Sequence, residues 1–393
     1  MQITFYSFLL SILWSSILII FIFLGRKKHF FDKGFGIASL VLLYLFCTVR
    51  MLFPIDFKFT RGIGFKGFFT AFYDIIYFQK FNLGVISVSI LEISGIVWMV
   101  VTFILIIRFW HQYYCVMKEI DTYNKREDNQ CQTLLHKIWD NNRRRLQVEI
   151  FCSNRVGIPM GIGIFKKRII LPDEDYTDME LYYILLHEYT HFLNRDLIIK
   201  MLVHMFCYIF WWNPIVYLLR KDLEQTLEIK CDLYATEDMS NRSKADYLTT
   251  IVSSLKRIEE KKLPEALHGT VALAKGSNDL EMVERFRMIS KTHTLRRHNK
   301  VFTTAWFGIF AIMLVFSYSF VIQPSYSPPI EEIVTNPKVY DIEITPDNSY
   351  IIERKDGTYV LVNSNGETLE ITEKYALLME SQGMKIRKEV SIR

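Results

Sequence analysis

Apolar residues occur along this chain in long blocks rather than in the periodic stripes of a soluble protein. Four blocks each approach the length of about 20 residues that an α-helix needs to cross a bilayer. They are Phe5–Leu24, Phe35–Phe53, Val85–Ile107 and Phe302–Ile322. The pattern predicts four membrane-spanning helices. The first is expected to stay uncleaved, because no basic residue precedes it and no small-residue cleavage site is obvious.

Basic residues beside these blocks predict the orientation of the helices. The basic run 26–28 follows the first block, Arg108 follows the third, and the basic residues of 296–300 precede the fourth. Lysine and arginine are enriched on the cytoplasmic side of spanning helices. We therefore expect a multi-pass cell-membrane protein whose N-terminus and C-terminal tail are extracellular. Arg50, near the outer end of the second block, disagrees with this orientation.

The predicted topology divides the chain into four parts. Residues 1–108 would contain three spanning helices with an external loop at 54–84. Residues 109–301 would form a cytoplasmic domain, 302–322 the fourth helix and 323–393 a small extracellular domain.

Two features depart from this simple pattern of spanning helices. A fifth apolar block, 198–219, contains Asn213-Pro214, which would break a helix. A full crossing here would change the side of all that follows, so we expect a broken helical pair that dips into the inner leaflet or packs on it. Glu92 lies inside the third block, where a carboxylate is a candidate functional group. A partly hydrated position near the outer interface explains it equally well.

The expected cytoplasmic domain mixes helices and strands. LQVEIFCS and GIGIFKKRIILP are predicted strands, because they are rich in β-branched and apolar residues and bounded by Gly and Pro. We expect a charged helix at Asp121–Arg145 and an amphipathic helix at Tyr247–Lys261. Thr177–Glu180 fits a capping box, which would open another helix.

The expected extracellular tail has the pattern of a small β-rich domain. Asp356-Gly357 and Asn365-Gly366 lie between alternating apolar residues, as in β-hairpins. ITEKYALLMESQGMKI would add a short helix. Such a tail could be a sensing or docking module for an external ligand, or equally a compact appendage or a partner-binding flap.

Composition changes this picture little. Half of the residues are hydrophobic, and the net charge of +5 is mild and on its own says little about partners. No direct contact with nucleic acid is expected. The six cysteines match neither a disulfide framework nor a Cys-x-x-Cys metal site. They are expected to be scattered reduced or buried thiols.

Candidate chemistry is concentrated in LLHEYTHFLNRD, residues 185–196. On a helix, His187 and His191 share one face and can offer two imidazoles to one metal ion. Zinc with three protein ligands lowers the pKa of a bound water to about 7. Glu188 could hold that water and act as general base. The alternative is a buried histidine pair on an amphipathic helix, with a salt-bridging glutamate.

A third ligand would separate these two interpretations, and LEQTLEIKCD offers three carboxylates. Glu228 can be the third ligand, and Glu224 is its competitor. Asp232 lies four residues after Glu228 and can accept a hydrogen bond from a ligand histidine.

The strand before the motif helix is a candidate for binding substrate. If its edge is free, an extended peptide could pair with it. The alternative, an ordinary core strand, is compatible with this role. The residues concerned are Gly161, Ile162, Gly163 and Ile164.

Together these segments resemble the BlaR/MecR-type membrane metallopeptidases, the antibiotic-sensing antirepressors. The resemblance rests on SNRVGIPMGIGIFKKRIILP, LLHEYTHFLNRD, WWNPIVYLLRKDLEQTLEIKCD and ERFRMI. It implies a multi-pass α-helical membrane protein with a cytoplasmic α+β gluzincin-like zinc metalloprotease domain. It also implies zinc on His187, His191 and Glu228, Glu188 as catalytic base and Asp232 as a supporting residue.

The resemblance further implies signalling through proteolysis. An external ligand activates the protease, which leads to loss of a winged-helix repressor, and family members also cut themselves before the last helix. Self-cleavage here would fall within Glu284–Lys300, a basic stretch that is expected to be exposed. The candidates are Arg285, Phe286, Arg287 and Met288.

The tail departs from the family. It is too short for a penicillin-binding domain and contains no Ser-x-x-Lys. Ser253–Lys256 matches that pattern, but it lies in a predicted helix on the cytoplasmic side, and we interpret the match as coincidence. β-Lactam sensing by acylation is therefore not expected, and the sensed ligand and homodimer formation are left open.

The sequence thus favours a regulatory zinc endopeptidase that relays an external signal by cleaving itself and cleaving or inactivating a cytoplasmic BlaI/MecI-like repressor. The alternative is a zinc protease for quality control of membrane proteins, for which the tail would be incidental. A third hypothesis is a transducer with a silent motif, against which the intact set of ligands argues.

Overall fold

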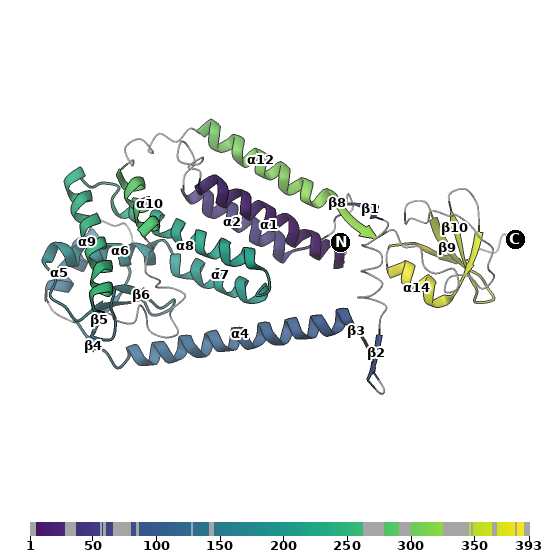
Figure 1. Ribbon diagram of the computed structural model, residues 1–393, viewed down its shortest axis with the longest axis horizontal. Helices are drawn as coiled ribbons and strands as arrows, with labels where there is room; N and C mark the ends of the chain where they lie inside the picture. The colour runs from purple at the N-terminus through teal and green to yellow at the C-terminus, as the bar shows by residue number, and fades with distance from the viewer. Residues whose placement is uncertain are drawn as a thin grey trace. The chain divides into compact units, whose positions relative to one another are not determined.

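The computed structural model contains two compact units (Figure 1). The first comprises Met1–Ile63 and Asp74–Gln323, and the second comprises Gly64–Tyr73 and Pro324–Arg393. The residues that the structure describes are 5–27, 37–55, 57, 60–65, 80–83, 86–126, 129–140, 145–261, 279–290, 300–324, 346, 349–363, 368–381 and 383–388.

Four apolar helices of the first unit correspond to the four predicted blocks. They are α1 (Phe5–Lys27), α2 (Ile37–Leu52), α4 (Ile90–Ile120) and α12 (Lys300–Ser319). Among the described residues, α1 and α4 are long and apolar enough to cross a membrane, whereas α2 and α12 contain shorter apolar stretches. These helices support membrane association. The orientation of each helix stays a prediction.

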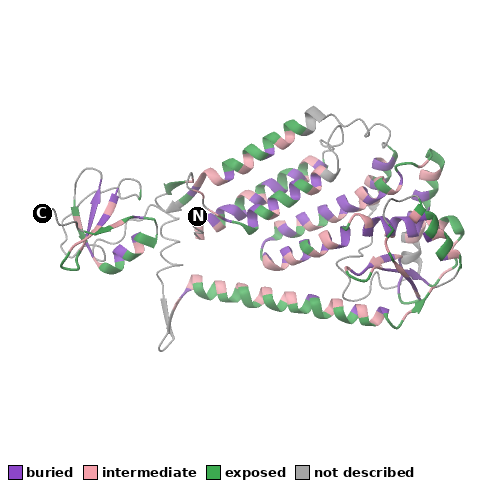
Figure 2. Cartoon of the chain, turned by 180° about the vertical axis from the view of Figure 1, so that it is seen from behind, coloured by how far each residue is buried: buried purple, intermediate pink, exposed green. Residues whose placement is uncertain are grey.

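Helix α4 begins at Ile90, later than the predicted block, because Ser89 caps it. The Ser89 hydroxyl accepts a hydrogen bond from the Glu92 N–H at 3.3 Å, and Glu92 Oε2 accepts one from the Ser89 N–H at 2.8 Å. This capping box satisfies N–H groups at the start of the helix. Glu92 therefore caps the helix end instead of lying within the apolar span. Figure 2 shows that α4 is mostly exposed or half-buried, which fits apolar side chains that face lipid.

The apolar block 198–219 is folded as two helices, α7 (Asp196–Ile209) and α8 (Pro214–Ala235). The Asn213 side chain accepts a hydrogen bond from the Ile215 N–H at 2.9 Å and so caps α8. The predicted helix break is thus confirmed. Both helices pack against α1, α2 and α12 through a buried cluster that includes Leu18, Ile19, Leu43, Val203, Phe206, Leu219, Leu223 and Phe310.

A four-stranded sheet lies beside the motif helix, with the strand order β4-β5-β7-β6. The strands are β4 (Asn124–Lys125), β5 (Glu149–Ser153), β6 (Met160–Ile162) and β7 (Arg168–Pro172). Strand β6 pairs antiparallel with β7 and forms one edge of the sheet. The segment predicted as a single strand is therefore a hairpin.

Gly163 explains why this segment turns. Its φ is +93°, and a Cβ at this position would lie 1.9 Å from the Lys166 carbonyl oxygen. Only glycine fits such a turn. Gly161 and Ile162 consequently lie in the edge strand, whereas Gly163 and Ile164 lie in the turn.

The predicted helix at Asp121–Arg145 is confirmed for Asn129–Asp140 and wrong for Asp121–Arg126. Only α5 (Asn129–Asp140) is helical, because Lys125 pairs with Phe151 of β5 and so draws the preceding segment into the sheet. Residues 127–128 and 141–144 lie outside the described residues.

Helix α6 (Asp178–Leu193) carries the motif and packs on the sheet through buried Leu181, Leu185 and Tyr189. Its predicted capping box is confirmed: Thr177 is the N-cap and Glu180 the reciprocal partner. The amphipathic helix α9 (Asn241–Lys261) begins earlier than predicted, and α10 (Asp279–Ser290) follows it.

The second unit contains the expected β-rich fold. Strands β9 (Ser349–Glu353), β10 (Tyr359–Asn363), β11 (Thr368–Ile371) and β12 (Ile386–Lys388) form a sheet in the order β11-β10-β9-β12, with helix α14 (Glu373–Ser381). The hairpin at Asp356-Gly357 is confirmed, with Gly357 at φ +82°. Asn365-Gly366 lies outside the described residues.

Two further two-stranded sheets complete the described strands. One pairs β2 (Lys80–Leu83) with β3 (Ile86–Ser89), directly before α4. The other pairs β1 (Arg61–Phe65) with β8 (Phe320–Pro324).

Candidate metal centre

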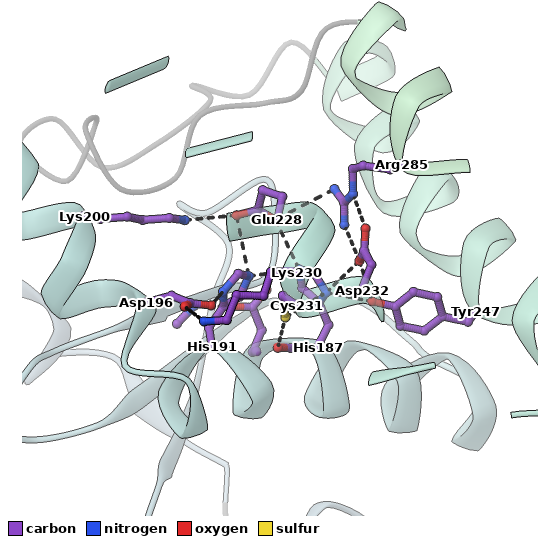
Figure 3. A network of polar contacts seen from close by, with 12 residues as sticks. His187, His191, Asp196, Lys200, Glu228, Lys230, Cys231, Asp232, Tyr247 and Arg285 are labelled. Atoms are coloured by element: carbon purple, nitrogen blue, oxygen red, sulfur yellow. Dashed lines mark hydrogen bonds and ion pairs between the residues drawn. The ribbon is translucent and has the colours of Figure 1, made fainter. Parts of the chain in front are cut away.

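Helix α6 presents the two histidines of the motif to one buried point (Figure 3). Because His187 and His191 are one turn apart, their rings project from one face, and their Nε2 atoms lie 3.2 Å apart. Helix α8 brings Glu228 opposite them, with its Oε2 3.5 Å from Nε2 of His187 and its Oε1 3.5 Å from Nε2 of His191. Both histidines are buried, whereas the Glu228 side chain is 24% exposed. The three donors therefore face one another beside a solvent-accessible position.

The spacing of these donors fits a zinc ion. Ligand atoms about 2.0–2.1 Å from a tetrahedral zinc ion lie roughly 3.3 Å from one another. Here the two Nε2 atoms lie 3.2 Å apart, and each lies 3.5 Å from a different oxygen of the Glu228 carboxylate. Two imidazoles and one carboxylate also leave a fourth position for water, as in catalytic zinc sites.

Cys231 is a second candidate for the third ligand. Its Sγ and one nitrogen of each histidine lie within 4.8 Å of one another. However, this Sγ lies 3.7 Å from Nδ1 of His187, on the other side of the ring from Nε2, and it donates to the His187 carbonyl oxygen at 3.4 Å. Because both Nε2 atoms face Glu228, the geometry favours Glu228 over Cys231.

His191 is oriented by a carboxylate that sequence reasoning missed. Its Nδ1 lies 2.9 Å from Oδ2 of the buried Asp196, and Lys230 Nζ donates to Oδ1 of the same carboxylate at 3.0 Å. Arg195 adopts a left-handed φ of 58°, where the chain turns from α6 into α7. With Nδ1 donating to Asp196, the Nε2 lone pair is available to a metal. The spacing of Asp196, five residues after His191, was the sequence feature from which this contact could have been predicted.

His187 is oriented through a tyrosine. Its Nδ1 lies 2.8 Å from the Tyr247 hydroxyl, which donates to Oδ1 of Asp232 at 2.7 Å. Asp232 itself lies 3.3 Å from Nδ1. The predicted supporting carboxylate is therefore beside the histidine, but Tyr247 of α9 makes the shorter contact. Sequence reasoning missed Tyr247 because no local pattern brings α9 to this point.

Arg285 of α10 completes this arrangement. It donates from Nε and Nη2 to the two oxygens of Asp232 at 2.6 and 2.8 Å. Burial alone would raise the pKa of Asp232, but the ion pair with Arg285 holds it well below its usual range. Asp232 is consequently ionised and can anchor Tyr247.

Glu228 is also kept ionised by its neighbours. Lys200 of α7 donates to its Oε1 at 3.0 Å. Burial alone would raise the pKa of Glu228, but Lys200, His191 and His187 together hold it well below its usual range. The ionised carboxylate is the form that binds a metal.

Glu188 points from α6 toward the edge of the sheet. Its Oε2 accepts a hydrogen bond from the Gly161 N–H at 2.6 Å. A Cβ at Gly161 would lie 3.1 Å from this oxygen and 3.2 Å from the Phe192 ring, so glycine allows β6 to approach α6 this closely. The candidate base is thus next to His187 on α6 and is hydrogen-bonded to the edge strand.

Comparison with known proteins identifies the family. Residues 79–289, more than half of the chain, match the model of the BlaR1 peptidase M56 family. The chain belongs to this family. A metallopeptidase family implies a bound metal, for which the cluster on α6 and α8 provides donors.

Three relatives show how far the similarity extends. The regulatory protein BlaR1 of Staphylococcus aureus is 26% identical over 183 residues, which cover 45% of this chain and 30% of that protein. The methicillin resistance mecR1 protein of Staphylococcus aureus strain Mu50 is 36% identical over 88 residues, 22% of this chain and 15% of that protein. BlaR1 of Bacillus licheniformis is 25% identical over 134 residues, 34% of this chain and 22% of that protein. The chain therefore matches less than a third of each relative's length.

The stretch that was expected to be exposed before the last helix is partly buried. Arg285 and Met288 are 5% and 9% exposed, because α10 packs them against α8 and α9, whereas Phe286 is 37% exposed. Arg287 is half-buried, and residues 291–299 lie outside the described residues. The expectation of exposure was wrong for Arg285 and Met288. Arg285 is buried because it pairs with Asp232, and no local sequence pattern indicates a contact between residues so far apart.

The structure also describes Glu224 and the Ser-x-x-Lys match of α9. Glu224, the competitor of Glu228, lies 3.7 Å from Arg220 on the same helix. The hydroxyls of Ser253 and Ser254 both donate to the Thr250 carbonyl oxygen within α9, which fits the interpretation of the Ser-x-x-Lys match as coincidence.

The role of Asp196 can be tested with Asp196→Asn. The substitution removes the charged acceptor of His191, so zinc affinity should fall by roughly 10- to 100-fold. Chelator competition with purified protein measures this affinity. Asp140→Asn is the matched control, because that carboxylate and its partner Arg145 are both 70% exposed. Wild-type affinity in Asp196→Asn would contradict the proposed orientation of His191.

Proposed function

We propose that this protein is a regulatory zinc endopeptidase with a gluzincin-like centre, in which His187, His191 and Glu228 hold the metal. The observation that carries the proposal is the meeting of both Nε2 atoms, 3.2 Å apart, with the Glu228 carboxylate, whose two oxygens each lie 3.5 Å from one Nε2. Bound zinc would lower the pKa of a water molecule and polarise the scissile carbonyl.

Glu188 is the general base in this proposal. It lies next to His187 on α6, and its carboxylate can take the proton of the attacking water and deliver it to the leaving amine. Its hydrogen bond to the Gly161 N–H keeps the carboxylate directed toward the sheet edge. Asp232 supports His187 through Tyr247.

The substrate is an extended peptide that adds to β6. Strand β6 lies at the edge of the sheet and contacts Glu188 through Gly161. Peptides add to such edges through main-chain hydrogen bonds. Gly161 and Ile162 provide the strand backbone, and Gly163 and Ile164 shape the turn beyond it.

The proposed biological role is signal relay across the cell membrane. The relatives are named as regulatory and methicillin-resistance proteins. In this chain, a signal at the extracellular tail would lead to cleavage or inactivation of a cytoplasmic winged-helix repressor of the BlaI/MecI type and to self-cleavage within 284–300. Apolar helices α1, α2, α4 and α12 would hold the protease beside the bilayer, with the N-terminus outside.

Glu188→Gln tests the catalytic role. The variant should bind zinc as the wild type does but lose cleavage by about 100-fold or more, because the general base is gone. Zinc content and fragments of the chain and of co-expressed repressors, followed by immunoblot, measure the two effects. Glu180→Gln on the same helix is a control, since this residue closes the capping box far from the histidines. Unchanged cleavage in Glu188→Gln would rule out the proposal.

Deletion of residues 323–393 separates signalling from the alternative, quality control of membrane proteins. A signalling protease should lose its response to the inducing condition or become active without it, because the tail is the external part. A quality-control protease should degrade misfolded membrane proteins at the wild-type rate. Repressor levels and turnover of a misfolded membrane protein, compared in the same cells, distinguish the two.

A further inference from the structure

Helix α10 contains two adjacent charged residues that enter different buried clusters. Glu284 pairs with Arg26 at the end of α1, and Arg285 pairs with Asp232 behind the metal centre. Consecutive residues of an α-helix point about 100° apart. One short helix therefore contacts both the end of an apolar helix and the support of a metal ligand.

The first cluster joins four helices. Nε of Arg26 donates to both oxygens of Asp222 on α8 at 2.9 and 2.8 Å, and the Tyr44 hydroxyl of α2 donates to the same carboxylate. Arg26 also donates to Glu284. The side chains of Arg26, Asp222 and Glu284 are 7%, 1% and 15% exposed. Buried charges require partners, so the position of Arg26 constrains the position of α10.

The second cluster joins α10 to the metal centre. Arg285 makes two hydrogen bonds to Asp232, which accepts one from Tyr247, which contacts Nδ1 of His187. The Arg285 and Asp232 side chains are 6% and 1% exposed. Nη1 of Arg285 also lies 3.9 Å from Glu228. Displacement of Arg285 would therefore change the surroundings of His187 and Glu228, two of the proposed ligands. Arg285 itself is not hydrogen-bonded directly to either residue.

We propose that α10 couples the end of α1 to the metal centre, with Glu284 holding the helix to Arg26 and Arg285 acting as a positioning residue for His187 through Asp232 and Tyr247. This coupling rests on the proposed function, because it describes regulation of the same site. A movement of α1 that draws Arg26 away from Glu284 shifts Arg285 and loosens His187. Zinc affinity thereby becomes sensitive to the apolar helices without a change in the ligands themselves.

Glu284→Gln in the full chain is the central test. It weakens the contact with Arg26 but leaves Arg26 paired with Asp222. Zinc affinity, measured by chelator competition, should fall by roughly 2- to 30-fold. Glu281→Gln is the matched control: it makes the same charge change on the same helix, and its partner Lys221, 3.5 Å away, is 62% exposed. This control should keep wild-type affinity.

A double-mutant cycle identifies the route of the coupling. Arg285→Gln should lower zinc affinity by roughly 10- to 100-fold, as loss of such support does, and Arg285→Lys should recover part of it. If the effect of Glu284 passes through Arg285, then Glu284→Gln should cause no further loss in the Arg285→Gln background. Additive losses would overturn the coupling, and so would wild-type affinity in Glu284→Gln. Because Glu284→Gln is a mild change, the test stands even if Arg285→Gln does not fold.

These outcomes are distinguishable from failure of the proposed function. A wild-type chain that binds no zinc overturns both. A wild-type chain that binds zinc, together with Glu284→Gln that binds it equally well, overturns the coupling alone.

Discussion

Two buried carboxylates, Asp196 and Asp232, are the constraint on which the site depends. Both are fully buried, and each lies behind one histidine of the motif. A buried charge is costly unless it is paired and hydrogen-bonded. Lys230 meets Asp196 and Arg285 meets Asp232. Helices α6 to α10 must therefore converge, and this convergence fixes the two Nε2 atoms in front of Glu228.

The same pairs explain why the site connects with the apolar part of the chain. Helix α8 carries Asp222 near its middle, and Glu228 and Asp232 follow toward its C-terminal end. Its N-terminal half packs in the apolar cluster with α1 and α2, and its C-terminal half meets α6. Helix α8 therefore connects the apolar cluster with the candidate metal centre. Helix α10 adds a second connection through Glu284 and Arg285.

Features that depend on helix period or local turns could be predicted from the sequence. His187 and His191 share a face because four residues nearly complete a turn, and Thr177 caps α6 through its own neighbours. The contacts of Glu228 and Asp232 with the histidines could be expected from the residue types of a ligand set, but the contacts made by α9 and α10 could not. Tyr247 and Arg285 are 15 and 53 residues from Asp232, and no local pattern encodes those distances. The turn at Gly163 was missed, although Lys166 and Lys167 interrupt the apolar run there.

The most direct test of the central claim is X-ray absorption at the zinc edge of the purified full-length protein. Ligation by His187, His191 and Glu228 predicts a first shell of nitrogen and oxygen alone, at about 2.0–2.1 Å, with outer-shell scattering from imidazole. A sulfur scatterer at about 2.3 Å would place Cys231 among the ligands and would contradict the account.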